Sequence, residues 1–382
     1  MSKPKNISPD TLLAQASHYI DEQTGALMPS IQPSTTYGRD QNYELLGDYI
    51  YARNHNPTYD QVEKVMAELE GGADTLIFAS GQAAITAVFE TVEHGRHIVA
   101  PSIMYHGAQA WMRRLAEKRG IKLTLFDATE PDGLANAVRQ GQTDVVWIET
   151  LLNPTWDVID IQKAAQIAHD AGAILGVDAT VTPPVTLRAL SLGADLVFHS
   201  ATKYLNGHSD VLGGVLITAK KDDRWQEIYD VRTLVGGVMG PFEAWLLLRG
   251  MRTLGIRCER AFASAAKIAS HFENHPKIER VLYPGLQSHP GHTLAARQMT
   301  AGFGGMLSFL VNGDAAMAKA MIAKLKVFIA ATSLGGVESL VEHRLSVEGP
   351  ESLVPENLIR ISIGIENVDD LIGDLQQALD HV

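Results

Sequence analysis

The sequence predicts an α/β protein in which a larger domain, built on a mostly parallel sheet, is followed by a smaller α+β domain. Short apolar runs, rich in β-branched and aromatic residues, alternate with helical patterns through the first half of the chain. After about Leu248 this rhythm changes, and helical stretches surround two more strand-like runs. The length of 382 residues is also too great for one small core, which favours two domains.

The first 58 residues carry Pro, Ser, Thr and Tyr without strong periodicity, and we expect them to form an extended N-terminal arm. A helix is predicted from Tyr59 to Glu70, where the Gly71-Gly72 pair ends it. Its apolar face consists of Val62, Val65, Met66 and Leu69.

Six apolar runs predict the strands of the larger sheet, over a domain of residues 59–248. Because helical patterns separate them, we expect crossover helices and a largely parallel sheet. In chain order the runs are TLIFA before Ser80, HIVA before Pro101, KLTLF before Asp127, VVWI before Glu149, ILGV before Asp178 and LVFH before Ser200.

The smaller domain is predicted over residues 249–382. Its strands are expected at GMLSFLV, residues 305–311, and LIRISI, residues 358–363, and a last amphipathic helix follows Val368.

Charge and cysteine content narrow the classes of partner and compartment. The formal net charge of -12, with no block of Lys or Arg, argues against nucleic acid as a partner. The single cysteine, Cys258, excludes an intrachain disulfide and suits the cytoplasm. No apolar signal core and no apolar run of about 18 residues is present, so we expect neither secretion nor a membrane partner.

Polar residues that follow the predicted strands indicate the site. In open α/β sheets, ligands bind beyond the carboxyl ends of the strands. The residues expected there are Ser80-Gly81, Tyr105, Glu149 with Asn153, Asp178, and Ser200 to Lys203. Hydroxyls, a carboxylate, an aromatic ring and one amine are the groups that pyridoxal 5'-phosphate (PLP) requires.

Each of these groups has a task in a PLP site. Lys203, if desolvated, can react as a neutral amine with the cofactor aldehyde, hold it as a Schiff base, and later move a proton. Asp178 can pair with the pyridine nitrogen and make the ring an electron sink. Gly81 and Gln82 begin a helix whose free amides favour a phosphate, to which Ser200 and Thr202 can donate.

Taken singly, these residues have commoner structural interpretations. A lysine after a strand is usually solvated, an aspartate is often a helix cap, and a tyrosine is often part of the core or its rim. Their joint occurrence at one sheet edge is what favours the PLP site. A metal hydrolase is not indicated, because the 14 histidines are scattered without an HExxH motif. A catalytically silent regulatory protein is opposed by intact Lys203, Asp178 and Arg360.

Motifs along nearly the whole chain resemble the Cys/Met-metabolism family of PLP enzymes, the transsulfuration group of cystathionine synthases and lyases. The resemblance is carried by YARNHNPTYDQVE (51–63), FASGQAA (78–84), ETLLNPTWDVIDI (149–161), VDAT (177–180), SATKYLNGHSD (200–210), YPGLQSHPGH (283–292), SLGGVESL (333–340) and IRISIGIENVDDLI (359–372).

The resemblance implies a fold-type I, aspartate aminotransferase-like large domain that binds PLP, a smaller C-terminal domain, and a homotetramer of two catalytic dimers. It implies that Lys203 and Tyr105 are catalytic, with Tyr105 stacked on the cofactor and Asp178 on its pyridine nitrogen. The remaining implied roles are phosphate binding by Gly81, Gln82, Ser200 and Thr202, phosphate binding in the neighbouring subunit by Tyr51 and Arg53, and substrate carboxylate binding by Arg360, assisted by Asn153 and Ser333.

The sequence departs from the family pattern at three places. His106-Gly107-Ala108 replaces the usual Gly-Gly-Thr after the stacking tyrosine, and Gln82 replaces a usual Met. Methionine γ-lyases usually carry a cysteine at the position of Gly107, which weakens that reading. Thr332 stands where many cystathionine γ-synthases and γ-lyases have a glutamate, and this difference leads us to expect a different recognition of the distal end of the substrate.

The expected reaction is carbon-sulfur bond cleavage in L-cystathionine or a related sulfur amino acid by β- or γ-elimination. The alternatives are γ-replacement on an O-acyl-homoserine, as in cystathionine γ-synthases, and methionine γ-cleavage. The motifs do not separate these reactions, and they leave the roles of His106 and Thr332 open.

Overall fold

The computed structural model describes residues 7–350 and 352–382, which are organised around two β-sheets. The larger sheet has seven strands in the order β1-β7-β6-β5-β4-β2-β3, and the smaller has five in the order β10-β11-β12-β9-β8. The strands are β1 (Asp74–Phe78), β2 (His97–Pro101), β3 (Lys122–Phe126), β4 (Thr143–Glu149), β5 (Ile174–Asp178), β6 (Leu196–Ser200), β7 (Gly214–Thr218), β8 (Ile278–Leu282), β9 (Met306–Val311), β10 (Ile329–Ala330), β11 (Leu340–His343) and β12 (Leu358–Ser362).

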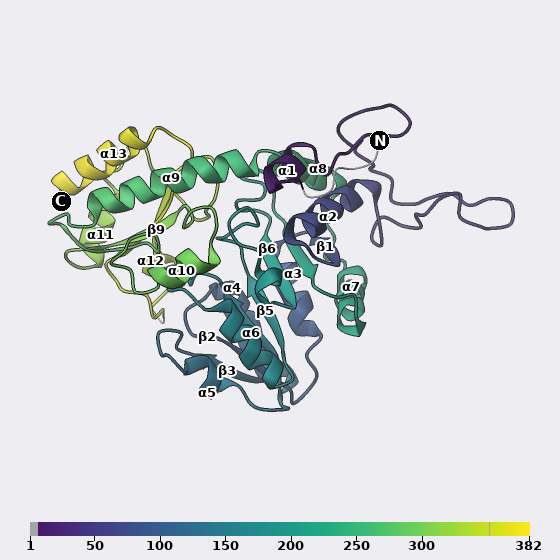
Figure 1. The fold of residues 1–382 in the computed structure, drawn as a ribbon, viewed down its shortest axis with the longest axis horizontal. Helices are drawn as coiled ribbons and strands as arrows, with labels where there is room; N and C mark the ends of the chain where they lie inside the picture. The colour runs from purple at the N-terminus through teal and green to yellow at the C-terminus, as the bar shows by residue number, and fades with distance from the viewer. Residues whose placement is uncertain (1–6, 351) are drawn as a thin grey trace.

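Helices cover the larger sheet and one long helix reaches the smaller one (Figure 1). They are α1 (Pro9–Ala14), α2 (Pro57–Glu70), α3 (Gly81–Glu90), α4 (His106–Arg119), α5 (Gly133–Ala137), α6 (Ile161–Asp170), the 3-10 helix η1 (Ala189–Leu192), α7 (Asp223–Val235), α8 (Pro241–Met251), α9 (Leu254–Phe272), α10 (His292–Gln298), α11 (Ala315–Ile322), α12 (Arg344–Glu348) and α13 (Val368–Asp380).

The α/β class and the largely parallel sheet are confirmed. All six predicted runs form strands, and β3, β2, β4, β5 and β6 pair in parallel. Strand β7 is not among the predicted strands, and it pairs antiparallel to both β1 and β6. No helix lies between β6 and β7, and a return without a crossover helix gives an antiparallel pair.

Helix α2 confirms the predicted entry helix and begins two residues earlier, at Pro57. Asn56 caps it by accepting a hydrogen bond from the Thr58 N–H, and proline suits the first helical position. It ends at Gly71, whose φ of 76° lies in the left-handed region that glycine adopts without strain.

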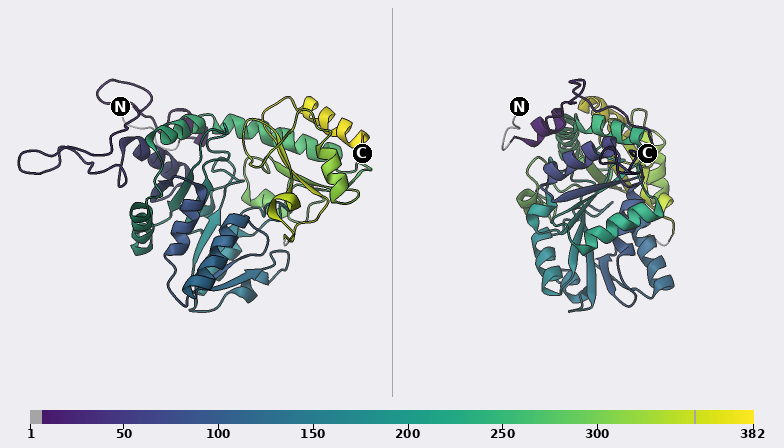
Figure 2. Two further views of the ribbon diagram at one scale, coloured as in Figure 1. Left: turned by 180° about the vertical axis from the view of Figure 1, so that it is seen from behind. Right: turned by 90° about the vertical axis from the view of Figure 1, so that its right-hand side faces the viewer.

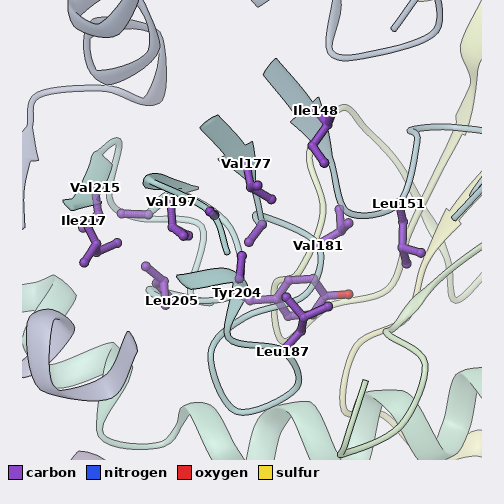
Figure 3. Close-up of a cluster of buried hydrophobic side chains, with 14 of the residues drawn as sticks. Ile148, Leu151, Val177, Val181, Leu187, Val197, Tyr204, Leu205, Val215 and Ile217 are labelled. Atoms are coloured by element: carbon purple, nitrogen blue, oxygen red, sulfur yellow. The ribbon is translucent and has the colours of Figure 1, made fainter. Parts of the chain in front are cut away.

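Alternating side chains give the larger sheet an apolar layer on each face. On β4, Val146 and Ile148 pack into one buried cluster, whereas Val145 and Trp147 pack into the other. Figure 3 shows the first cluster, in which side chains of neighbouring strands meet Leu187, Tyr204 and Leu205 below the sheet. Burial on both faces explains why these strands read as continuous apolar runs.

The smaller sheet has a core of its own. Phe309 of β9 and Ile361 of β12 are buried against Phe272 of α9 and Leu375 of α13. The predicted strands at residues 305–311 and 358–363 and the last helix are confirmed as β9, β12 and α13. Helix α9 runs from the region of α1 and α8 to this sheet (Figure 1).

The segment between α1 and α2 contains no helix or strand and leaves the body of the molecule as long loops (Figure 2). It exposes Leu27, Tyr43, Leu46 and Ile50. Within the described residues, every helix is too short or too polar to span a membrane.

Candidate active site

A cavity of about 500 Å³ lies beyond the carboxyl ends of β4, β5 and β6. Its wall is completed by residues that flank β10 and by α12 and β12, so both sheets contribute to it. Of the predicted site residues, the cavity brings together Gly81, Gln82, Tyr105, Asn153, Asp178, Ser200, Thr202, Lys203, Ser333 and Arg360.

Lys203 lies in the turn that follows β6, and its amine reaches the opposite wall. The Nζ atom donates to Ser333 Oγ at 2.8 Å. Burial, assisted by the nearby Arg360 guanidinium, lowers the pKa of Lys203 to about 8. The amine is therefore closer to its neutral, nucleophilic form near neutral pH than an exposed lysine would be.

Asp178 and Glu149 are two buried carboxyl groups side by side at the ends of β5 and β4, where they form a register pair. Asp178 Oδ1 accepts the Thr180 N–H at 2.9 Å. Burial raises the pKa of Asp178 to about 6, and burial together with the Asp178 charge raises the pKa of Glu149 to about 8. The pair holds its negative charge only against a desolvation cost, so a positive group in the cavity would stabilise it.

Glu149 also fixes two loops at the cavity. Its Oε1 accepts the Tyr105 N–H at 2.6 Å, and its Oε2 accepts the Asn153 N–H at 3.2 Å. One side chain on β4 thus holds the backbone of both predicted ligand-facing residues.

The start of α3 faces the same cavity. Ser80 caps the helix by accepting the Ala83 N–H at 3.1 Å, which leaves the first-turn amides of Gly81 and Gln82 toward the cavity. A side chain at Gly81 would place its Cβ only 3.2 Å from Ser200 Oγ. The space between this helix start and Ser200 is therefore a cradle that glycine keeps open, and a phosphate fits there.

Tyr105 forms the aromatic wall; it is 37% exposed and lies at the N-cap of α4. Gln82 Nε2 donates to the Gly107 carbonyl at 3.2 Å and ties this turn to α3. A Cβ at Gly107 would lie 2.8 Å from the Tyr105 ring, so the turn in this conformation has no room for a cysteine. His106 also lines the cavity, with its ring centroid 5.0 Å from that of Tyr105.

Arg360 on β12 is 4% exposed and belongs to a buried charge network. Its Nη1 donates to Asn153 Oδ1 at 3.3 Å and its Nη2 to the Ser333 carbonyl at 3.0 Å. The Glu342 carboxylate forms an ion pair with the same Nη2. This contact holds the guanidinium in one orientation.

Glu342 serves a second arginine as well. Its Oε2 accepts from Arg344 Nη1 at 3.1 Å, and its Oε1 accepts from the Thr332 hydroxyl at 2.9 Å. Arg344 is 2% exposed and lines the cavity beside Arg360. Thr332 therefore contacts the carboxylate that orders both arginines.

Ser333 joins the lysine and the arginine. Its hydroxyl accepts from Lys203 and its carbonyl accepts from Arg360. Its φ of 122° is strained for a residue other than glycine, at a cost on the order of 1–3 kcal/mol. A strained backbone held by two charged side chains is typical of a functional site.

Tyr51 and Arg53 lie outside the cavity, in the loops before α2. Tyr51 is 40% exposed, and the Arg53 guanidinium lies 5.6 Å from its ring centroid. Arg53 Nη1 donates to the Thr233 carbonyl at 2.6 Å, so α7 holds the pair at the surface.

Glu149 was expected at the site without an assigned role, whereas Glu342 and Arg344 were not among the predicted site residues. Glu149 ends an apolar run, and this position at a strand end was the sequence feature that indicated its place at the site. Arg344 and Glu342 follow SLGGVESL in a stretch whose burial the sequence does not reveal. Among the described residues, no three His, Cys, Asp or Glu side chains converge as metal ligands.

The larger sheet is mostly parallel and presents a lysine and an aspartate at neighbouring strand ends. A helix start and a buried arginine line the same cavity. This combination is that of a PLP-dependent enzyme of fold type I. Comparison with known proteins identifies the group. The model of the Cys/Met metabolism PLP-dependent enzyme family matches residues 10–380, and the chain belongs to that family.

Relatives of the chain catalyse several reactions. It is 41% identical to cystathionine γ-lyase of Bacillus subtilis, over 97% of this chain and 99% of that protein. It is 39% identical to cystathionine γ-synthase of Mycobacterium tuberculosis, over 97% and 96%. The crystal structure of cystathionine γ-synthase from Xanthomonas oryzae, in complex with aminoacrylate and cysteine, is 36% identical with a TM-score of 0.94, and 99% of each chain is covered. The chain is thus a PLP-dependent enzyme of the cystathionine lyase and synthase type.

Proposed function

We propose that the protein cleaves the carbon-sulfur bond of L-cystathionine or a related sulfur amino acid by β- or γ-elimination. The observation that carries this proposal is the bridge of Ser333, which places the Lys203 amine and the Arg360 guanidinium on one cavity. An α-amino acid needs both, because its carboxylate must be held while a proton is moved at the neighbouring carbon. The 41% identical relative, a cystathionine γ-lyase, supports a lyase.

The donor set suits PLP. We propose that Lys203 holds the cofactor covalently, that Asp178 pairs with its pyridine nitrogen, and that Tyr105 stacks on its ring. The open cradle at Gly81 and Ser200, with Gln82 and Thr202, suits its phosphate. PLP, when bound, supplies the electron sink that stabilises negative charge at the substrate α-carbon. A positive pyridine nitrogen would also give the buried Asp178 and Glu149 pair a counter-charge inside the cavity.

On the substrate side, we propose that Arg360 binds the α-carboxylate as a fork, assisted by Asn153 and Ser333. Lys203, once released from the cofactor, is the group that takes the α-proton and returns it, because it is the cavity amine and its pKa is lowered toward neutrality. The Glu149 carboxyl accepts hydrogen bonds from the backbone N–H groups of Tyr105 and Asn153 and so fixes the cofactor-stacking residue relative to the substrate-binding residue.

We further propose a homotetramer of two catalytic dimers in the cytoplasm. Tyr51 and Arg53 would then bind the cofactor phosphate of the neighbouring subunit, which agrees with their position on a surface loop away from their own cavity. The division into an arm of residues 1–58, a large domain of residues 59–248 and a small domain of residues 249–382 is part of the same proposal. Its second boundary falls within α8.

Product analysis of the purified holoenzyme tests the reaction. With L-cystathionine alone, we expect a 2-oxo acid and ammonia, with pyruvate marking β-cleavage and 2-oxobutanoate marking γ-cleavage. With an O-acyl-homoserine plus cysteine, formation of cystathionine with little breakdown in the first mixture would make the protein a synthase. That result would overturn the lyase proposal and leave the cofactor assignment intact.

A further inference from the structure

Arg344 has no role in the function proposed above, although it is one of two arginines that line the cavity. It begins the short helix α12, directly after β11, and only 2% of its side chain area is exposed. A buried arginine carries a large desolvation cost, which is offset only by paired charges and hydrogen bonds.

Two carboxylates hold Arg344 in place and leave part of it free. Glu342 Oε2 accepts from Nη1 at 3.1 Å, and Glu348 Oε1 lies 2.7 Å from Nε. Among the described residues, Nη2 has no hydrogen-bond partner. Because a guanidinium carries five N–H groups, the edge formed by Nη1 and Nη2 retains donors that can meet a carboxylate in a fork.

Among the described residues that line the cavity, no other free cation serves this purpose. Burial lowers the pKa of His106, which keeps its imidazole neutral at neutral pH. Lys203 is assigned to the cofactor and Arg360 to the α-carboxylate. Arg344 is therefore the cavity cation that remains for a second acidic group.

Arg344 and Arg360 also stand at a fixed separation. Both bind Glu342 Oε2, so one carboxylate sets the position of the two guanidinium groups relative to each other. A substrate that carried a carboxylate at both ends would engage one arginine with each.

We infer that Arg344 selects L-amino acids whose side chain ends in a second carboxylate, such as the distal carboxylate of cystathionine or of a succinyl ester. This inference rests on the proposed function, since it assigns the α-carboxylate to Arg360. Substrates with a neutral end, such as methionine or an acetyl ester, leave the free edge of Arg344 unpaired inside the cavity. The cost of that unpaired donor makes the arginine a specificity-determining residue.

A pair of esters that differ in the distal carboxylate tests the inference. The holoenzyme is assayed for 2-oxobutanoate from O-succinyl-L-homoserine and from O-acetyl-L-homoserine, and again with cysteine for cystathionine. We expect kcat/KM to be higher for the succinyl ester in the wild type. In Arg344→Gln the ratio of the two kcat/KM values falls about 10- to 100-fold, which is the effect of one charge-assisted hydrogen bond.

Glu348→Gln is the matched control. It removes one anchor of Arg344 and keeps the guanidinium, so the preference for the succinyl ester should persist in this variant. If Arg344→Gln lowers both esters equally and leaves their ratio unchanged, Arg344 only supports Glu342 and Arg360, and the inference is wrong.

A binding measurement on the wild type avoids any folding defect of the variant. L-2-aminosuberate ends in a carboxylate and L-norleucine does not, and each is titrated against the visible absorbance of the holoenzyme. We expect a Kd at least tenfold lower for the aminosuberate, and equal values would overturn the inference. The wild type could convert cystathionine but neither ester nor methionine. In that case the ratio of the Kd for L-norleucine to the Kd for L-2-aminosuberate is measured in the wild type and in Arg344→Gln, and the two ratios are compared in place of the ester ratios. If it converts none of them, the proposed function itself fails.

Discussion

Replacing Glu342 with glutamine perturbs the charge network at its centre. The carboxylate contacts Arg344 Nη1 at 3.1 Å, forms an ion pair with Arg360 and accepts the Thr332 hydroxyl at 2.9 Å. The three charged side chains are 6%, 2% and 4% exposed in the order Glu342, Arg344, Arg360. Glutamine keeps the shape and one acceptor oxygen, but removes the charge that two buried guanidinium groups share.

The expected cost is large because the perturbed charges cannot reach water. Removing one partner of a buried ion pair typically costs about 3–5 kcal/mol, and we expect the lower end of that range because Arg344 keeps Glu348. The matched control is Thr332→Val, which deletes only a hydroxyl donor to the same carboxylate and should cost about 1.5 kcal/mol.

Two assays measure the effects of Glu342→Gln on stability and on substrate binding. Urea unfolding of the apoprotein, followed by tryptophan fluorescence at fixed protein concentration, gives the loss of unfolding free energy. Steady-state kinetics on cystathionine gives the effect on Arg360, the proposed carboxylate-binding residue, which we expect as an increase in KM larger than the fall in kcat. An unfolding free energy within about 0.5 kcal/mol of wild type, together with an unchanged KM, would refute the view that Glu342 orders both arginines.

Further predictions concern the cofactor side of the site. Lys203→Ala should lose the visible absorbance of the holoenzyme and nearly all turnover, and full activity in this variant would end the assignment of Lys203. Because burial lowers the pKa of Lys203 to about 8, the rate at which the apoprotein reacts with PLP should rise with pH and be half-maximal near 8, whereas a midpoint near 10.5 would contradict that shift. Tyr51→Ala and Arg53→Ala should each raise the Kd for PLP about tenfold with a smaller change in kcat, as expected for a lost charge-assisted contact, and unchanged PLP affinity in both would count against the intersubunit role. Burial raises the pKa of Glu149 from 4.5 to about 8, so the folded apoprotein binds more protons than the unfolded chain between these values and its unfolding free energy falls as pH rises. Glu149→Gln should flatten that fall, and an unchanged slope would assign the proton to another group.

The larger sheet was predictable because its strands are buried on both faces. TLIFA, VVWI and LVFH stand out as apolar runs for that reason, and their polar ends fall at one sheet edge whatever the details of packing. Strand β7 was not predicted because it follows β6 without an intervening helix. The alternation of strand and helix that indicated the other strands is absent there.

The charge network was not predictable from the sequence, and the reason is its tertiary origin. Glu342, Arg344 and Glu348 are charged residues within seven positions, a pattern that usually marks a solvated surface. The burial of Glu342 and Arg344 depends on the pairing of β11 with β12, which sets Glu342 directly opposite Arg360 in the register. Arg360 itself was found through a family motif, whereas its partners depend on the pairing of two strands.

We expect the different contributions of the two sheets to account for the different reactions of relatives with nearly equal identity. Lys203, Asp178 and the start of α3 belong to the larger sheet and bind the cofactor in the proposed site, which a lyase and a synthase need alike. Thr332, Arg344 and Arg360 come from the smaller sheet and its flanking segments, and they face the part of the cavity left for the substrate. Reaction choice should therefore depend on the second set. Exchanging the segment from Thr332 to Glu348 between this chain and a γ-synthase should then change the preferred acyl or thioether substrate, while the visible absorbance of the bound cofactor stays the same.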